Sequence, residues 1–166
     1  FPALISARMR SVLVMVGSTI SQMDDLRSAE LRRAIRRVAQ DVLVGIQGDR
    51  LVLVLGGEGD LYGAAASLTS RFGPAPVIIG PVVPTLDEAP RSAAAALAGL
   101  EAAPAWPQAP RPVTADELLP ERMLVGDPLA RASLIAQAFE PLSQAGGALL
   151  ETLSAYRSTG RSPEGA

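Results

Sequence analysis

The sequence contains no cysteine, no histidine and no lysine, so all 15 of its basic residues are arginines. Without cysteine there are no disulfides and no thiolate nucleophile. Without histidine there is neither a Ser-His-Asp triad nor a zinc site built from His and thiolate ligands. The lack of lysine excludes a Schiff base and a Gly-Lys-Ser/Thr phosphate loop. Any catalysis would therefore depend on carboxylates, hydroxyls, arginines and a hard cation such as Mg²⁺.

Long apolar runs are absent as well. No 18 consecutive residues are all apolar, which predicts that nothing in the chain spans a membrane. No charged segment followed by an apolar segment and a cleavage site opens the chain, so we expect a cytoplasmic protein. What is present suits a folded domain with an appendage, because 48% of the 166 residues are hydrophobic and the net charge is only −2.

Apolar and amphipathic segments alternate over the first hundred residues. Four apolar runs rich in branched side chains predict strands, at 11–16, 41–46, 50–55 and 76–83. Pro81 within the last of them favours an edge position or an early end. Helices are expected within 25–40, from an N-cap at Asp60 to about residue 72, and from an N-cap at Thr85 to about residue 101.

This order of elements indicates an α+β fold. Strand, helix, strand, strand, helix, strand, helix is the ferredoxin-like, split βαβ pattern, which places helices on one face of an antiparallel sheet. The turn between the second and third strands, Gln47-Gly48-Asp49-Arg50, is short enough to make these strands a hairpin.

The last third of the chain differs in composition. Four prolines between residues 104 and 112 predict an extended connector over 104–113, and Trp106 is expected to pack this loop onto its domain. Three segments with helical spacing follow, with Thr114 and Asp127 as N-caps. At the end, Ser162, Pro163 and an acidic residue form a helix start that only two more residues follow, so we expect a further helix beyond the sequence.

Two local patterns resemble ligand sites but have simpler explanations. The segment 57–63 is rich in glycine and lies between a strand and a helix, as a dinucleotide fingerprint does. Its third glycine is one position late, and Glu58 and Asp60 would repel a pyrophosphate, so a capped turn is favoured. The arginines between 27 and 37 lie opposite an apolar stripe, which favours a solvated face or a subunit contact over a nucleic-acid surface.

The hairpin turn and the C-terminal run together resemble one family. Residues 1–103 are similar to the GGDEF-like domain of bacterial PucR/CdaR-type transcription regulators, whose fold is similar to the nucleotide-cyclase palm. The turn residues that carry this resemblance are Gln47, Gly48, Asp49, Arg50 and Leu51. The segment "VIIGPVV" resembles the next strand of that fold. The C-terminal run that leads into a helix-turn-helix in these regulators is matched by Leu149, Leu150, Glu151, Thr152, Leu153, Tyr156, Gly160, Ser162 and Glu164.

The same resemblance indicates that the chain is not an enzyme. In active diguanylate cyclases the turn reads Gly-Gly-Asp-Glu-Phe, and its acidic pair, with an aspartate of the first strand, holds metal ions and the nucleotide. Here Arg50 occupies the second acidic position, and the first strand has no carboxylate. One carboxylate beside an arginine is a poor Mg²⁺ site. We therefore expect no catalytic residue, no metal and no cofactor, with Asp49 serving the turn.

The resemblance implies three parts and a regulatory function. Residues 1–103 form a degenerate GGDEF-like domain, 104–113 a proline-rich connector, and 114–166 a helical segment leading to a DNA-binding helix-turn-helix outside the sequence. The domain would form a homodimer or a higher homo-oligomer, matching palindromic operators, and would transmit a small-molecule effector signal to that DNA-binding part. Leu150, Leu153 and Tyr156 would lie on the coupling helix. The chain resembles in particular actinobacterial members, some of which control fatty-acid or mycolic-acid synthesis.

A stand-alone ligand-binding module is the alternative. In this hypothesis a nucleotide or an acyl-CoA occupies the vestigial cleft at Gly48, Asp49 and Arg50, where the arginine pairs with a phosphate bidentately.

Overall fold

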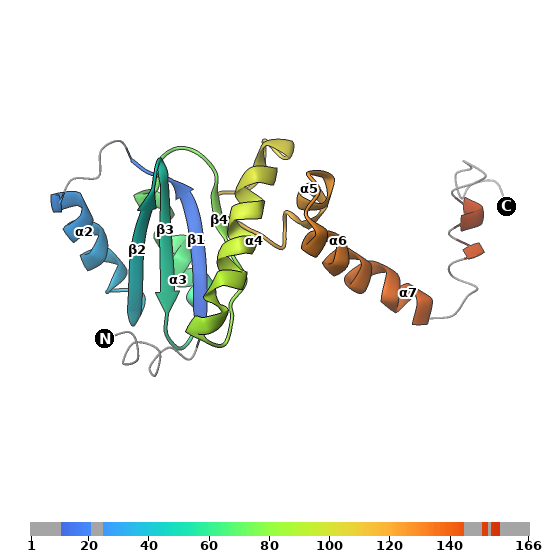
Figure 1. Cartoon of the computed structure of the whole chain (residues 1–166), viewed down its shortest axis with the longest axis horizontal. Coiled ribbons are helices and arrows are strands. Elements are labelled where there is room, and N and C mark those ends of the chain that lie inside the picture. The colour runs from blue at the N-terminus through green and yellow to red at the C-terminus, as the bar shows by residue number, and fades with distance from the viewer. Residues whose placement is uncertain (1–10, 21–24, 145–150, 153, 157–166) are drawn as a thin grey trace.

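A single five-stranded sheet forms the centre of the fold. The computed structural model describes residues 11–20, 25–144, 151–152 and 154–156. The strands are β1 (Val12–Ser18), β2 (Asp41–Gln47), β3 (Arg50–Gly56), β4 (Val77–Ile79) and β5 (Val113–Thr114), in the order β2-β3-β1-β4-β5. The pairs β2–β3, β3–β1 and β1–β4 are antiparallel, and β5 is parallel to β4. The predicted α+β fold is therefore confirmed (Figure 1).

The helices lie between and after the strands. They are α2 (Asp25–Ile35), α3 (Leu61–Ser67), α4 (Ala89–Ala102), α5 (Leu119–Leu124), α6 (Pro128–Leu134) and α7 (Glu140–Gln144). Single 3₁₀ turns occupy Thr69–Arg71, Leu86–Glu88 and Ala103–Ala105, and a π-helical segment, Ile135–Phe139, joins α6 to α7. No helix in this part of the chain combines the length and the apolar character that crossing a membrane requires.

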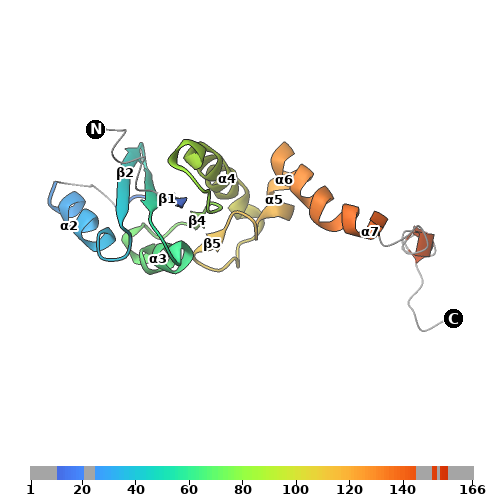
Figure 2. The same ribbon diagram turned by 90° about the horizontal axis from the view of Figure 1, so that it is seen from below.

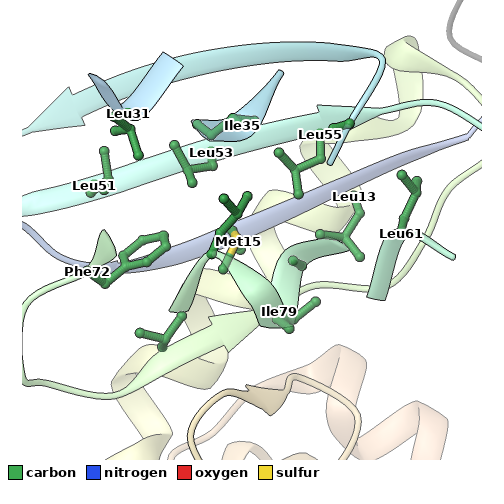
Figure 3. Close-up of a cluster of buried hydrophobic side chains, with 14 residues drawn as sticks. Leu13, Met15, Leu31, Ile35, Leu51, Leu53, Leu55, Leu61, Phe72 and Ile79 are labelled. Carbon is green, nitrogen blue, oxygen red and sulfur yellow. The ribbon is translucent and has the colours of Figure 1, made fainter. Parts of the chain in front are cut away.

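The first layer of the core lies between the sheet and helices α2 and α3. Leu13 and Met15 of β1 point into it together with side chains from β3 and β4, as Figure 3 shows. Leu31 and Ile35 of α2 close it on one side, and Leu61 of α3 closes it on the other. All these side chains are buried. Alternate side chains of β1 and the apolar residues at helical spacing in α2 therefore pack into one apolar layer.

The opposite face of the sheet is also covered, by α4. Val14, Val16 and Ile78 pack there against Ala96 of α4, and Figure 2 shows α4 on the other side of the sheet from α2 and α3. The prediction of helices on one face is therefore wrong. A Cβ on Gly99 would lie 2.8 Å from Cγ2 of Ile78, so the absence of a side chain lets α4 approach the sheet closely.

The proline-rich stretch returns to the sheet. After the 3₁₀ turn Ala103–Ala105, Trp106 packs against the α4 side of the core, as predicted. The chain then forms β5, and Ala115 and Leu118 are buried in the same cluster. Arg111 donates hydrogen bonds to the carbonyl oxygens of Gly73 and Ala75. The interpretation of 104–113 as an extended connector missed this return, because a two-residue strand has no periodicity to detect.

Two expected caps differ in detail from the structure. Thr85 precedes a 3₁₀ turn, and α4 begins only after Glu88. Thr114 ends β5 and exchanges hydrogen bonds with Glu117, the reciprocal pattern of a capping box, although α5 begins later. The Thr114 hydroxyl accepts from Glu117 N–H at 3.2 Å, as an N-cap does, whereas the Thr85 side chain makes no capping hydrogen bond to the 3₁₀ turn that follows it.

β4 ends at Ile79, before the end of the predicted strand 76–83, and Ser92 of α4 supplies a hydrogen bond to β1 beyond that point. Gly80 N–H donates to the Val14 carbonyl at 2.8 Å, and pairing resumes between Val12 and Val83. Between these points the N–H of Val14 donates instead to the Ser92 hydroxyl at 3.0 Å. Ser92 is fully buried, so this hydroxyl is the hydrogen-bond partner of a backbone group that water does not reach.

Replacing Ser92 with alanine should therefore destabilise the protein. The Val14 N–H would remain buried without a partner, which costs about 1 to 3 kcal/mol. Ser67→Ala is the matched control, because the Ser67 hydroxyl is exposed and donates only to Ala64; its effect should stay within about 0.5 kcal/mol. Urea denaturation measures both, and equal effects of the two changes would contradict this role of Ser92.

Candidate functional site

The hairpin turn has the geometry that its sequence predicts. Gln47 and Arg50 are paired, so Gly48 and Asp49 are the two loop residues between β2 and β3. Gly48 has a φ of 63°, in the left-handed region that two-residue hairpins favour and that glycine adopts without strain. Thr19 N–H donates to the Asp49 carbonyl at 2.7 Å, which fixes the turn to the end of β1.

Polar but uncharged groups flank Arg50 across the strands. Its neighbour on β1 is Ser18, and its neighbour on β2 is Gln47. Neither Ser18 nor Gln47 can replace a carboxylate as a metal ligand, because neither side chain carries a negative charge. In the ranges that the structure describes, no three Asp, Glu, His or Cys residues gather where they could hold a metal ion. The turn therefore keeps its backbone geometry next to a β1 end that offers only Gly17 and Ser18.

The glycine-rich segment after β3 is a helix cap, as predicted. The Asp60 carboxylate accepts a hydrogen bond from Gly63 N–H at 2.9 Å, at the start of α3. Gly59 has a φ of 96°, which directs the chain into this cap. The segment thus positions α3 against the sheet.

A buried ion pair joins the domain to its helical extension. The Arg122 guanidinium lies 2.8 Å from the Asp127 carboxylate, and their side chains are 5% and 11% exposed. Arg122 also donates to the Ala115 carbonyl at 3.0 Å. The same Asp127 carboxylate caps α6 by accepting from the N–H groups of Leu129 and Ala130. The sequence identified Asp127 as a cap but not its partner, because nothing local distinguishes Arg122 from the other arginines.

The pKa of Asp127 reflects these contacts. Burial alone would raise the pKa of this carboxyl, but the hydrogen bond and charge of Arg122 and the two backbone N–H groups outweigh burial. The pKa therefore lies below its ordinary value of 3.8. The ionised carboxylate is the form that the junction stabilises.

The helical extension presents apolar side chains to solvent. α6, the π-helical segment and α7 continue from one another away from the sheet (Figures 1 and 2). Leu129 is 63% exposed and Phe139 is 54% exposed on this extension, and Leu124 of α5 is 76% exposed. Of the predicted coupling residues, Tyr156 is exposed, and Leu150 and Leu153 lie outside the described residues.

The arginines of α2 and its C-terminal end form a separate exposed surface. Arg32, Arg33, Arg36 and Arg37 are exposed, whereas Leu31 and Ile35 of the same turns are buried, as the spacing predicts. Val38, which helical spacing would place on the same face as Leu31 and Ile35, is exposed, whereas Ala39 is buried. Within the described ranges, none of these four arginines forms an ion pair.

Comparison with known proteins places this fold in a family. The model of the GGDEF-like domain family matches residues 8–102, more than half of the chain. The chain therefore belongs to the GGDEF-like domain family. Uncharacterised proteins of Mycobacterium bovis and Mycobacterium tuberculosis are 39% identical to it over 145 residues, which make up 87% of this chain and 35% of each relative. The chain thus spans about a third of the length of these relatives.

A solved structure matches almost the whole chain. The crystal structure of a regulator of polyketide synthase expression from Bifidobacterium adolescentis is similar with a TM-score of 0.74 and 26% sequence identity. The similarity covers 94% of this chain and 66% of that one. Together with the family match, it supports a GGDEF-like fold of the regulator type.

Changes at Asp127 should separate the cap from the ion pair. Asp127→Ala removes both and leaves the buried Arg122 charge unpaired, which should cost about 3 to 5 kcal/mol. Asp127→Asn retains a capping oxygen and loses the charge, so it should cost less. Because the folded pKa is lowered, the advantage of the wild type over Asp127→Asn should be full above pH 3.8 and should vanish as the pH falls through the folded pKa.

Denaturation between pH 2.5 and 7 measures this dependence, with the exposed Asp116→Asn as control. A wild-type advantage that persists unchanged at the acidic end, or an equal loss for both asparagine variants, would show that the Arg122 ion pair is not its source.

Restoring one acidic residue to the turn should not create a cyclase. Arg50→Glu places a second carboxylate beside Asp49, but β1 still presents Gly17 and Ser18 rather than a third ligand. We expect no GTP turnover with Mg²⁺ from either the wild type or this variant, measured by chromatography of the nucleotides. Arg71→Glu controls for the change in net charge, and cyclic dinucleotide formed by the wild type or by Arg50→Glu would contradict the expectation.

Proposed function

We propose that this chain is the non-catalytic regulatory and oligomerisation domain of a PucR/CdaR-type transcription regulator, which contacts DNA through a helix-turn-helix beyond residue 166. The observation that carries the proposal is the extent of the similarity to the Bifidobacterium regulator. It covers 94% of the chain, so it includes the helical extension as well as the GGDEF-like domain. If both proteins pass a signal from the GGDEF-like domain to a DNA-binding part, both need such a helical extension.

The hairpin turn supports a role without catalysis. Phosphoryl transfer depends on metal ions and on groups that neutralise the developing charge. The turn supplies Asp49 and the positively charged Arg50, and the adjacent β1 supplies a hydroxyl at Ser18. These groups suit a structural hairpin better than a two-metal site.

The exposed apolar residues of α5 to α7 support self-association. Leu124, Leu129, Ile135 and Phe139 are all more than 40% exposed, and large apolar side chains on neighbouring turns mark interaction sites. A two-fold contact along this extension would give a homodimer and would bring two DNA-binding parts together, with the symmetry of a palindromic operator.

The junction supports a route for an effector signal. The extension leaves the domain through the Arg122–Asp127 ion pair, directly beside the buried Ala115. A change in the domain that shifts α5 would therefore redirect α6. Control of fatty-acid or mycolic-acid synthesis genes in the cytoplasm is the corresponding biological function that we propose, on the basis of the resemblance of the sequence to actinobacterial regulators.

The full-length protein with its natural continuation tests this function. We expect it to select a palindromic duplex from a random DNA library, and we expect the 166-residue chain alone not to do so. Leu129→Glu with Phe139→Glu should lower both self-association and operator affinity about tenfold or more, the typical loss for a buried aromatic anchor.

Sedimentation velocity and fluorescence anisotropy measure these two quantities. Ser67→Glu with Ser70→Glu is the control, because it adds the same charge at exposed positions on the domain. Absence of any selected DNA would overturn the regulator proposal, and unchanged self-association in the Leu129/Phe139 variant would overturn the assigned interface.

A further inference from the structure

The outer edge of β2 carries no further strand in the described structure, and α2 lies on that side of β2 (Figures 1 and 2). β2 ends the strand order, beside α2 in Figure 1, and no described strand pairs with its outer side. Because Gln47 and Arg50 close a two-residue turn, they form a hydrogen-bonded pair, and alternate residues have their backbone groups directed toward β3. The N–H and C=O groups of Val42, Val44 and Ile46 therefore point outward. This seven-residue strand contains no proline and no lysine, the residues that usually protect an edge.

A positively charged hollow adjoins this edge. Its volume is about 370 Å³. It is lined by Arg32 of α2, by Arg36 and Gln40 of the segment between α2 and β2, and by Asp41, Val42, Leu43 and Val44 of β2. Two guanidinium groups thus face a single carboxylate. Both arginines are exposed, and neither forms an ion pair in the described part of the chain. An anionic group bound in the hollow would neutralise the positive charge of these two arginines.

The spacing of the two arginines matches a strand. Arg36 follows α2 directly, and its N–H donates to the Arg32 carbonyl at 3.1 Å, so the two residues are about one helical turn, or about 6 Å, apart along the axis. Alternate residues of a β-strand point to the same side and are about 6.6 Å apart. A strand added to β2 would therefore place two side chains, separated by one residue, opposite the two guanidinium groups. The intervening side chain would point to the other face, where Leu43 is 44% exposed.

We propose that the outer edge of β2 binds an extended segment of a partner protein, which adds a sixth strand and carries acidic residues at alternate positions opposite Arg36 and Arg32. The backbone groups of Val42, Val44 and Ile46 would supply the strand pairing, and the arginines would select the acidic–apolar–acidic pattern. This inference does not depend on DNA binding by the protein.

Charge argues against a second copy of this chain as the occupant. Antiparallel pairing of β2 with β2 about a two-fold axis would place both α2 helices on the same face of the joined sheet. Arg32 and Val44, the middle residue of β2, line the same hollow, so a two-fold axis at Val44 would bring the two Arg32 side chains toward each other. Like charges opposite each other destabilise strand pairing. A single-stranded nucleic acid fits less well, because no aromatic side chain lines the hollow for base stacking.

A labelled strand peptide provides the test. The probe is a fluorescein-labelled peptide of sequence Thr-Val-Thr-Val-Glu-Val-Glu-Val-Thr, and its anisotropy is titrated with the 166-residue chain. Arg32→Glu with Arg36→Glu should weaken binding at least about tenfold, because charge-assisted contacts become repulsive. Arg33→Glu with Arg37→Glu changes the net charge equally on the same helix but lines a different hollow, so it should leave the affinity within about twofold.

Two further changes test the strand pairing itself. Val44→Pro removes an outward N–H, which the fold of an edge strand tolerates, and it should abolish binding while the thermal melt confirms folding. The peptide can be N-methylated at either of its two sets of alternate backbone nitrogens. Methylation of the set whose N–H groups face β2 should abolish binding without any change in the protein. A peptide with lysine in place of both glutamates should not bind.

Each alternative predicts a different result. The proposal would be overturned in favour of general charge attraction if the two double arginine variants weakened peptide binding equally. Full binding of both N-methylated peptides would overturn it in the same way. Equally tight competition by a single-stranded oligonucleotide of the same charge would overturn it in favour of nucleic acid. Stronger self-association of the Arg32/Arg36 variant in sedimentation would identify β2 as a contact between copies of this chain.

Discussion

The burial of β1 on both faces is the constraint that organises this structure. Val12, Leu13, Val14, Met15 and Val16 are at most 1% exposed, so neither face of the strand can remain open to water. The ferredoxin-like order supplies one covering layer, from α2 and α3. The other face needs α4, and the chain after α4 must then return to the sheet as β5. The return of the proline-rich segment 104–113 to the sheet is in this sense a consequence of the burial of β1 on both faces.

Local signals in the sequence predicted the parts of the fold that local chemistry determines. The hairpin register follows from Gly48 and the flanking apolar runs, and the Asp60 and Asp127 caps follow from side chains that accept from the next turn. The second layer could not be predicted in this way. The alanines of α4 are compatible with exposure or burial in the sequence, and only the tertiary packing of Ala96 and Gly99 against Ile78 distinguishes the two. The Arg122–Asp127 pair is likewise a product of tertiary packing.

The candidate turn illustrates how backbone geometry and side-chain chemistry are encoded separately. The turn requires a left-handed residue at Gly48 and an accepting carbonyl at Asp49, and both requirements concern the main chain. The metal chemistry of a cyclase requires carboxylates at neighbouring positions, which the fold does not need. A change from an acidic residue to Arg50 therefore alters the chemistry of the site while the hairpin is unaffected. The hairpin that the sequence predicts is confirmed, and the absence of cyclase chemistry stays a prediction; each depends on only a few adjacent residues.

Asp127 performs two tasks with one carboxylate: it begins α6, and it holds Arg122 of the preceding helix. This carboxylate therefore helps to set the direction in which the extension leaves the domain, together with the buried Ala130 of α6. From Pro128 to Gln144 the helical segments span about 25 Å, so a rotation of about 10° at this hinge would displace the far end by about 4 Å. A small rotation of α6 about its first turn would therefore be amplified along the extension into a displacement at α7 comparable to the ~4.8 Å distance between neighbouring strands.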